Sequence, residues 1–157
     1  MQFTVHDQEL NDELSALMRN VKPSARRKMA KVIAMRIRGN RAGQIKKNVD
    51  PDFNKFAPRR PQKNKNAPKG LMFKKLSRKA KRLMFIENSA EEAMVGFRGK
   101  NIHILETHQE GGEATVNKLG LKVRYPERRL LGIGKTERII VRDEITKALA
   151  DKTSLES

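Results

Sequence analysis

The sequence of 157 residues contains no cysteine and no tryptophan, and it has a single tyrosine. The lack of cysteine excludes disulfide bonds, thiol chemistry and a cysteine-based zinc site, and it fits a protein made in a reducing cytosol. Hydrophobic residues make up only 37% of the chain. This composition predicts one domain with a small aliphatic core and some sequence outside it. Apolar runs are short, so we expect no signal peptide and no membrane span.

Acidic residues are nearly missing from the middle of the chain. Residues 19–82 hold 23 lysines and arginines against two aspartates, whereas residues 1–18 hold four acidic residues and no basic one. Residues 83–157 are balanced, with 12 residues of each sign, so the net charge of +17 comes from the middle segment. A segment this basic repels itself. We expect it to be solvated, to pair with acidic surfaces on other subunits, or to lie near a polyanion.

Signatures of catalysis are also scarce. The three histidines, His6, His103 and His108, do not have the spacing of a metal site. No Gly-x-Ser-x-Gly motif is present. The run 134–136, Gly-Lys-Thr, resembles the end of a phosphate-binding loop, but Arg129 stands where that motif requires its first glycine. We interpret the run as the start of a helix, and we expect no enzymatic activity, no cofactor and no metal.

The first 38 residues predict a helical hairpin. Asp7 is placed to cap a first helix, and Pro23 occupies a favoured position in the first turn of a second helix. This second helix is expected to end near Arg38, because Gly39 and Asn40 follow. The candidates for contact with DNA or an acidic protein surface are six basic residues of this helix and of the next segment: Arg26, Arg27, Lys28, Lys31, Lys63 and Lys65.

Residues 39–70 lack apolar periodicity and contain four of the six prolines. Proline removes backbone donors and resists both helix and central strand, so this segment predicts a long extended basic arm. Phe53 and Phe56 are its only aromatic side chains. We expect these rings to attach the arm to a protein surface, with a neighbouring subunit as one candidate. The candidate inter-subunit residues of the arm are Phe53, Phe56, Arg59 and Arg60.

Residues 71–150 predict an α+β core in which a small antiparallel sheet packs with helices. The expected elements are, in order, a short helix at 71–76, hairpin strands at 83–86 and 94–97, a helix from 101 to 110, a third strand at 121–125, and a closing helix that reaches 149. Residues 151–157 are expected to form a disordered tail.

Three short blocks in this region carry a further signal. Residues 125–134, Tyr-Pro-Glu-Arg-Arg-Leu-Leu-Gly-Ile-Gly, predict an extended segment, an apolar corner and a helix start, because Pro126 favours extended backbone before it. The other blocks are residues 72–76, Met-Phe-Lys-Lys-Leu, and residues 108–111, His-Gln-Glu-Gly. Their order and spacing resemble the virion morphogenesis (tail completion) family of contractile-tailed phages over about residues 20 to 150. Glu110 stands where that family often has an aromatic residue.

The resemblance implies a structural virion protein with no chemistry of its own. Such a subunit would form a homo-oligomeric ring, expected to be a hexamer, at the head-proximal end of the tail, and would be assembled in the host cytoplasm. Its partners would be the tail tube and the head-side connector or neck proteins, with non-specific DNA contact possible in the bore. His108 is expected to make a structural hydrogen bond at a turn. The residues expected at the corner or an interface are His108, Gly111, Tyr125, Pro126, Arg128, Leu130, Leu131 and Gly132.

Composition alone also allows a different class of function. A free-standing basic nucleic-acid-binding protein would share the charge, the missing cysteine and the basic arm. The arm offers almost no aromatic stacking surface and no base-reading pattern, so such binding would be independent of sequence. The ordered set of blocks favours the structural role, and the oligomeric state of the purified protein separates the two hypotheses.

Overall fold

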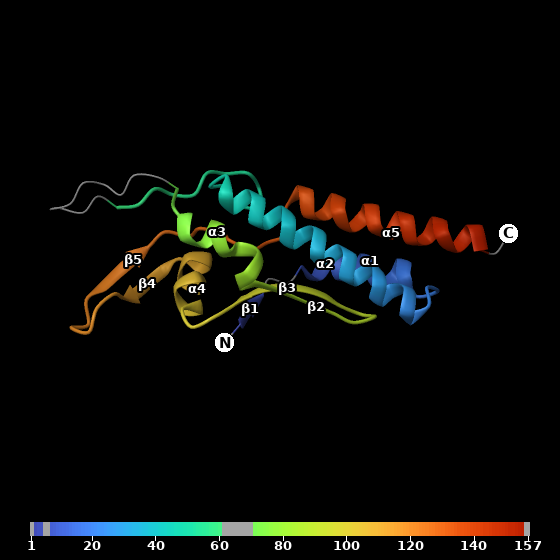
Figure 1. The fold of residues 1–157 in the computed structure, drawn as a ribbon, viewed down its shortest axis with the longest axis horizontal. Helices are drawn as coiled ribbons and strands as arrows, with labels where there is room; N and C mark the ends of the chain where they lie inside the picture. The colour runs from blue at the N-terminus through green and yellow to red at the C-terminus, as the bar shows by residue number, and fades with distance from the viewer. Residues whose placement is uncertain (1, 5–6, 61–70, 156–157) are drawn as a thin grey trace.

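The computed structural model describes residues 2–4, 7–60 and 71–155 of the chain. Its elements confirm the predicted α+β class. In chain order they are β1 (Gln2–Thr4), α1 (Gln8–Met18), α2 (Pro23–Lys46), α3 (Lys74–Leu83), β2 (Met84–Asn88), β3 (Ala93–Arg98), α4 (Ile102–Glu110), β4 (Gly112–Thr115), β5 (Lys122–Tyr125) and α5 (Lys135–Leu155). The long helices α2 and α5 lie side by side along an elongated molecule (Figure 1).

The strands form two antiparallel sheets instead of the single sheet predicted. The first has the order β1-β3-β2, and the second contains only β4 and β5. The predicted hairpin of β2 and β3 is confirmed, with Met84 opposite Phe97. The expectation that residues 121–125 form its third strand is wrong, since β5 pairs with β4 and β1 takes the third place. Both β1 and β4 are too short to give a periodic sequence signal.

The start signals of the first two helices are confirmed, but the predicted end of the second is wrong. The Asp7 side chain accepts a hydrogen bond from the backbone N–H of Leu10 at 3.0 Å, and Pro23 is the first residue of α2. Helix α2 continues past Gly39 to Lys46. Its last turns bury Ile45 and other side chains, and this burial outweighs the roughly 1 kcal/mol that one glycine costs in a helix.

The rest of the described arm, residues 47–60, begins with a tight turn instead of extended chain. One oxygen of the Asp50 carboxylate accepts hydrogen bonds from the backbone N–H groups of Asp52 (2.8 Å) and Asn54 (2.9 Å). After this turn the Phe56 ring enters the core of its own chain, so it is not an anchor for a neighbour. Phe53 has a positive φ of 65° and is 54% exposed. The predicted contact residues Lys63 and Lys65 lie outside the described residues.

Helix α2 separates two hydrophobic clusters and contributes to both. One cluster joins α2 to α3, α4 and the first sheet, and it contains Ala42, Ile45, Phe56, Phe73, Leu76, Ala80, Met84, Phe97, Ile102, Leu130 and Leu131. The other joins α1, α2 and α5, and it contains Leu10, Met18, Val21, Ile33, Ile37, Ile140, Val141 and Ile145. The shared helix therefore ties the sheet half of the molecule to the helical half.

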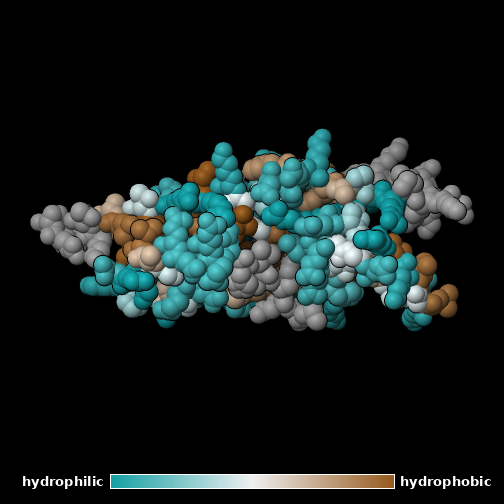
Figure 2. Space-filling model, turned by 180° about the vertical axis from the view of Figure 1, so that it is seen from behind, coloured by the Kyte–Doolittle hydropathy of each residue, from teal (hydrophilic) through white to brown (hydrophobic). Residues whose placement is uncertain are grey.

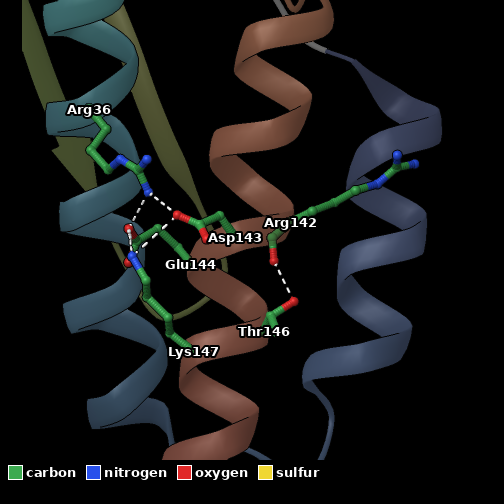
Figure 3. Close-up of polar contacts among 6 residues, drawn as sticks. All are labelled: Arg36, Arg142, Asp143, Glu144, Thr146 and Lys147. Carbon is green, nitrogen blue, oxygen red and sulfur yellow. Dashed lines mark hydrogen bonds and ion pairs between the residues drawn. The ribbon is translucent and has the colours of Figure 1, made fainter.

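Helix α5 is longer than predicted and is linked to α2 by exposed ion pairs. Arg36 donates to Asp143 at 2.7 Å and to Glu144, and Lys147 contacts the same two carboxylates from within α5 (Figure 3). The helix continues to Leu155, so the prediction of a disordered tail from residue 151 is wrong for residues 151–155. No glycine or proline follows Ala150 to stop the helix.

Candidate functional site

The corner at residues 125–134 lies where the end of α2, the 47–60 segment and the end of α4 meet. Leu130 and Leu131 are buried there, and the Gln109 side chain makes three hydrogen bonds to their backbone. The amide oxygen of Gln109 accepts from the N–H groups of Leu130 (2.8 Å) and Leu131 (2.9 Å). The amide nitrogen of Gln109 donates to the carbonyl of Leu131 at 2.9 Å. Gln109 thus satisfies the polar groups that the apolar corner leaves without a helix or sheet partner.

Arg41, from α2, holds the same corner. Its guanidinium donates through Nε (3.0 Å) and Nη2 (2.8 Å) to the carbonyl of Leu130, and its Nη1 donates to Gln44. The side chain is fully buried, and burial lowers the pKa of Arg41 to about 10, while the nearby Glu137 opposes the shift. Sequence analysis missed Arg41 because it assigned the residue to the arm. The signal was available, since Arg41 continues the four-residue spacing of Ile33 and Ile37.

Arg128 connects the corner to the 47–60 segment. Its Nε donates to the carbonyl of Ala57 at 2.7 Å and its Nη2 donates to that of Pro58 at 2.9 Å. Its backbone N–H donates to the carbonyl of His108 at 2.6 Å, and its Nη1 lies 3.1 Å from Nδ1 of His108. Arginine has no acceptor, so this contact requires an unprotonated Nδ1. Burial first, and then the charges of Arg128 and Arg59, lower the pKa of His108 to about 4, which keeps the ring neutral.

A row of rings brings the three sequence blocks of the family resemblance together. The His108 ring packs edge-on against Phe73 at 5.0 Å and against Tyr125 at 5.2 Å between centroids. Phe73 in turn packs edge-on against Phe56 at 5.2 Å. Near-perpendicular ring pairs at these distances are favourable. Residues 72–76, 108–111 and 125–134 therefore form one joint, with His108 of α4 packed between Phe73 and Tyr125.

At the start of α5, side chains and backbone of the same chain pack against the first helical turn. The carboxylate of Glu137 accepts from the backbone N–H of Gly134 at 3.1 Å and from the side chain of Asn40 at 2.6 Å. A Cβ added to Gly134 would lie 2.2 Å from the carbonyl oxygen of Pro51. This arrangement is that of a helix cap, with the third helical residue bonded back to the residue before the helix. The N–H of Gly134 is therefore bonded to a side chain of its own helix.

Two further glycines of the joint have no room for a side chain. Gly111 ends α4 with a φ of 71°, and a Cβ there would lie 2.9 Å from the backbone nitrogen of Glu127. A Cβ on Gly132 would lie 2.9 Å from the ring of Pro51. Pro126, by contrast, is exposed. The joint therefore depends on close backbone approach at three separate positions.

The other predicted contact residues lie away from the joint or at its edge. Arg59 donates to the carbonyl of Met72 at 2.5 Å, and Arg60 is exposed. Arg26 pairs with Glu91 at 3.6 Å. The remaining basic candidates of α2 are exposed, namely Arg27, Lys28 and Lys31. Sequence analysis did not single out α3, whose six basic residues are all exposed: Lys74, Lys75, Arg78, Lys79, Lys81 and Arg82.

The described residues offer little to a metal ion or a membrane. Among residues 2–4, 7–60 and 71–155, no three histidine or acidic side chains are grouped so that they could hold a metal ion. In the same part of the chain, no helix is both long and apolar enough to cross a bilayer. The side chains of Arg41, Gln109, Arg128 and Glu137 instead hydrogen-bond to backbone groups of the joint.

Comparison with known proteins found a matching family and a similar phage protein. The model of the phage virion morphogenesis family matches residues 5–150. Tail completion protein S of Escherichia phage P2 is 34% identical over 125 residues, which cover 77% of this chain and 82% of the phage protein. No solved structure matches. The match confirms the family that the three sequence blocks indicated, and it includes the whole joint. The chain therefore belongs to the phage virion morphogenesis family.

Proposed function

We propose that this chain is a structural subunit that completes a phage tail by forming a ring at the head-proximal end of the tail and enabling the head to join. The observation that carries the proposal is the family match over residues 5–150, together with the similarity to a protein named for tail completion. The proposed partners are further copies of the chain, with six as the expected number, the tail tube and the head-side connector or neck proteins.

The use made of the buried polar groups supports a structural role over an enzymatic one. Arg41, Gln109 and Arg128 direct their polar atoms to backbone groups of the corner and of the 47–60 segment. The Glu137 carboxylate caps a helix. Buried charges at an active site are aimed at a substrate, with some of their bonding capacity left open. Here that capacity holds the fold together.

The uneven charge supports assembly through unlike surfaces. The first 18 residues carry only acidic charge, while α3 and the exposed face of α2 carry mainly basic charge. A ring with one patch meeting a different patch on the next copy needs such complementary surfaces on each subunit. The same basic surfaces would lie near DNA if they faced the bore of the ring.

Deletion of the gene from the phage or prophage that carries it tests this function. We expect separate filled heads and tails of normal length in the lysate, and rescue by the full chain supplied from a plasmid. Gold labelling of a tagged copy should mark the head-proximal end of the tail in electron micrographs. Normal particles after deletion, or label elsewhere in the virion, would refute the proposal.

A second function, sequence-independent binding of nucleic acid, is favoured by one observation. Helix α3 carries six exposed basic residues within ten positions. Such a helix contacts phosphates, and its binding weakens steeply as salt rises. Fluorescence anisotropy with labelled duplexes of unrelated sequence measures this directly. Tight binding by a monomer would favour the nucleic-acid-binding function, whereas weak binding by an oligomer fits the ring subunit.

A further inference from the structure

The hairpin of β4 and β5 projects from the body at the end opposite the C-terminus of α5 (Figure 1). Its loop carries three exposed apolar side chains, Leu119 (93%), Leu121 (56%) and Val116 (44%). Figure 2 shows hydrophobic surface at this end of the molecule. A two-stranded hairpin is only marginally stable by itself, and an exposed apolar loop adds nothing to the stability of its own chain. A surface of this kind is typical of a contact with another molecule.

The loop is fixed by its own hydrogen bonds, so the exposure of Leu119 is a property of an ordered structure. The Asn117 side chain accepts from the backbone N–H groups of Leu119 (3.1 Å) and Leu121 (2.9 Å). The N–H of Val116 donates to the carbonyl of Leu121 at 2.8 Å, and Gly120 has a φ of 79°. The backbone that carries Leu119 is therefore held in one conformation. An apolar side chain ordered in advance loses little entropy when it enters a partner.

A groove that accepts such a side chain lies at the other end of the molecule. It has a volume of about 480 Å³ and runs between α1, α2, α5 and the turn joining β2 to β3. Its floor is apolar, and includes the half-buried Leu14 and Met29 beside the buried Ile33. The volume falls in the range of roughly 300–1,000 Å³ that is usual for pockets that bind ligands, so it has room for more than one side chain.

The charges around the hairpin loop and the groove are opposite. Lys118 and Lys122 flank the apolar tip and are exposed. The groove is lined by Glu91 and Glu92, both exposed, with Glu91 paired to Arg26 of the same lining, and α1 beside it adds further acidic side chains. Opposite charges at the edge of an apolar contact speed association and fix its orientation. This complementarity favours a partner with the surface of the groove itself, which is a second copy of the chain.

We propose that the hairpin loop at residues 116–121 inserts into the groove of a second copy. The loop and the groove lie far apart along the long axis (Figure 1), so one molecule cannot fill its own groove. Each copy then gives a loop to one neighbour and receives a loop from the other. Repetition of this head-to-tail contact closes into a ring when the rotation between copies allows it. The inference rests on the proposed ring and names the surfaces that build it.

Because the chain has no cysteine, single cysteines test this contact directly. The variants are Leu119→Cys at the loop and Glu92→Cys at the rim of the groove, each in the full chain. We expect a disulfide-linked dimer when the two oxidised variants are mixed, and far less of it from either variant alone. Absence of the mixed dimer would overturn the proposal, as would a Leu119→Cys dimer as the main product.

A second variant measures how much the apolar tip contributes. Leu119→Ser should weaken self-association in sedimentation velocity by about tenfold or more, while the circular dichroism spectrum stays unchanged. Val32→Ser is the matched control, because Val32 is 41% exposed on α2 and does not line the groove. Unaltered self-association of Leu119→Ser would overturn the proposal. If gold label still marks the tail end for a chain that forms no mixed dimer, the proposed function stands and this contact is wrong.

Discussion

The joint around residues 125–134 and the β4–β5 hairpin are neighbours in sequence, yet they handle their side chains in opposite ways. In the joint, Arg41, Gln109 and Arg128 bond inward to the backbone, and two leucines are buried. In the hairpin, the hydrogen bonds stay within the loop and the leucine at the tip is 93% exposed. The interactions of the joint stabilise the fold, whereas the hairpin leaves an apolar side chain exposed, where a partner could bind it.

This difference separates what identifies the family from what builds the assembly. The blocks that carried the resemblance meet in the joint, where they stabilise the chain itself. The hairpin loop carries no motif, and its only signal is apolar residues in a polar setting. Substitutions in the joint should therefore affect folding, whereas substitutions in the loop should affect only association. Four predictions, ordered by the size of the expected loss of stability, test that division.

The largest loss is expected for Gly134→Ala. The new Cβ would lie 2.2 Å from the carbonyl oxygen of Pro51, so either the 47–60 segment or the start of α5 must move. We expect the free energy of unfolding in urea to fall by about 4 kcal/mol. Gly39→Ala is the matched control, because a Cβ added at Gly39 would have nothing within 4 Å. This substitution should stabilise α2 by up to about 1 kcal/mol. Equal effects of the two variants would contradict the packing described for the joint.

Arg41→Met should cause the next largest loss. It keeps much of the buried volume but removes the donors that satisfy the Leu130 carbonyl and Gln44, at an expected cost of about 3 kcal/mol. Arg36→Met removes an arginine of the same helix that pairs with Asp143 and Glu144 of α5 (Figure 3). Its side chain is 39% exposed, so this loss should cost much less. Thermal unfolding of both variants checks the order. A larger loss for Arg36→Met would mean that the surface network, and not the joint, holds α2 in place.

The pH dependence of the free energy of unfolding should reveal the titration of His108. Its pKa is lowered to about 4 in the folded chain, so below the ordinary value near 6.5 the unfolded chain binds more protons. Stability should therefore fall as the pH drops from about 6.5 to 4, by about 2 kcal/mol for this half-buried ring. His108→Asn keeps an acceptor for Arg128 and removes the titration. The difference between the two unfolding curves isolates the ring, and parallel curves would contradict the neutral His108.

The smallest change is expected for Leu119→Ser. The side chain makes little contact with its own chain, so the free energy of unfolding of the monomer should change by less than about 0.5 kcal/mol. Urea unfolding at a concentration where the protein is monomeric measures this value. A clear loss of stability would show that the loop supports its own fold, and it would remove the contrast between the hairpin and the joint.

The sequence predicted the elements with strong local signals and missed those that depend on distant contacts. Asp7, Pro23 and Gly111 marked helix ends correctly, since capping and positive φ are local properties. The predicted end of α2 was wrong, because burial of the last turns of the helix, including Arg41, outweighs the loss of helix stability from the glycines at 39 and 43. The pairing of β4 with β5 was missed because Gly112 and Glu113 are poor strand formers. Proline content predicted an extended arm, but Phe56 returns residues 47–60 to the core.

For the candidate site, the sequence indicated the three blocks of the family resemblance but not the contacts between them. His108 and Tyr125 lie 17 positions apart in the chain, and nothing local predicts that their rings meet. Gln109 was visible as part of a block, yet its triple contact with the corner depends on how α4 approaches residues 130 and 131. Arg41 shows the general difficulty. A charged residue at a core position interrupts the apolar periodicity of a helix, and the sequence does not show which hydrogen-bond acceptor allows it to be buried.

The cap at Gly134 has a mechanical consequence for the far end of the molecule. Glu137 and Pro51 clamp the first turn of α5, while Ile140, Val141 and Ile145 in the next turns pack against α1 and α2, and the helix has 21 residues. At 1.5 Å per residue it is roughly 30 Å long, so a tilt of about 10° at the clamp would swing its tip by about 5 Å. Because α5 packs against α1 and α2, a shift at the Pro51 turn would reach the far end of the molecule only by moving those two helices with it.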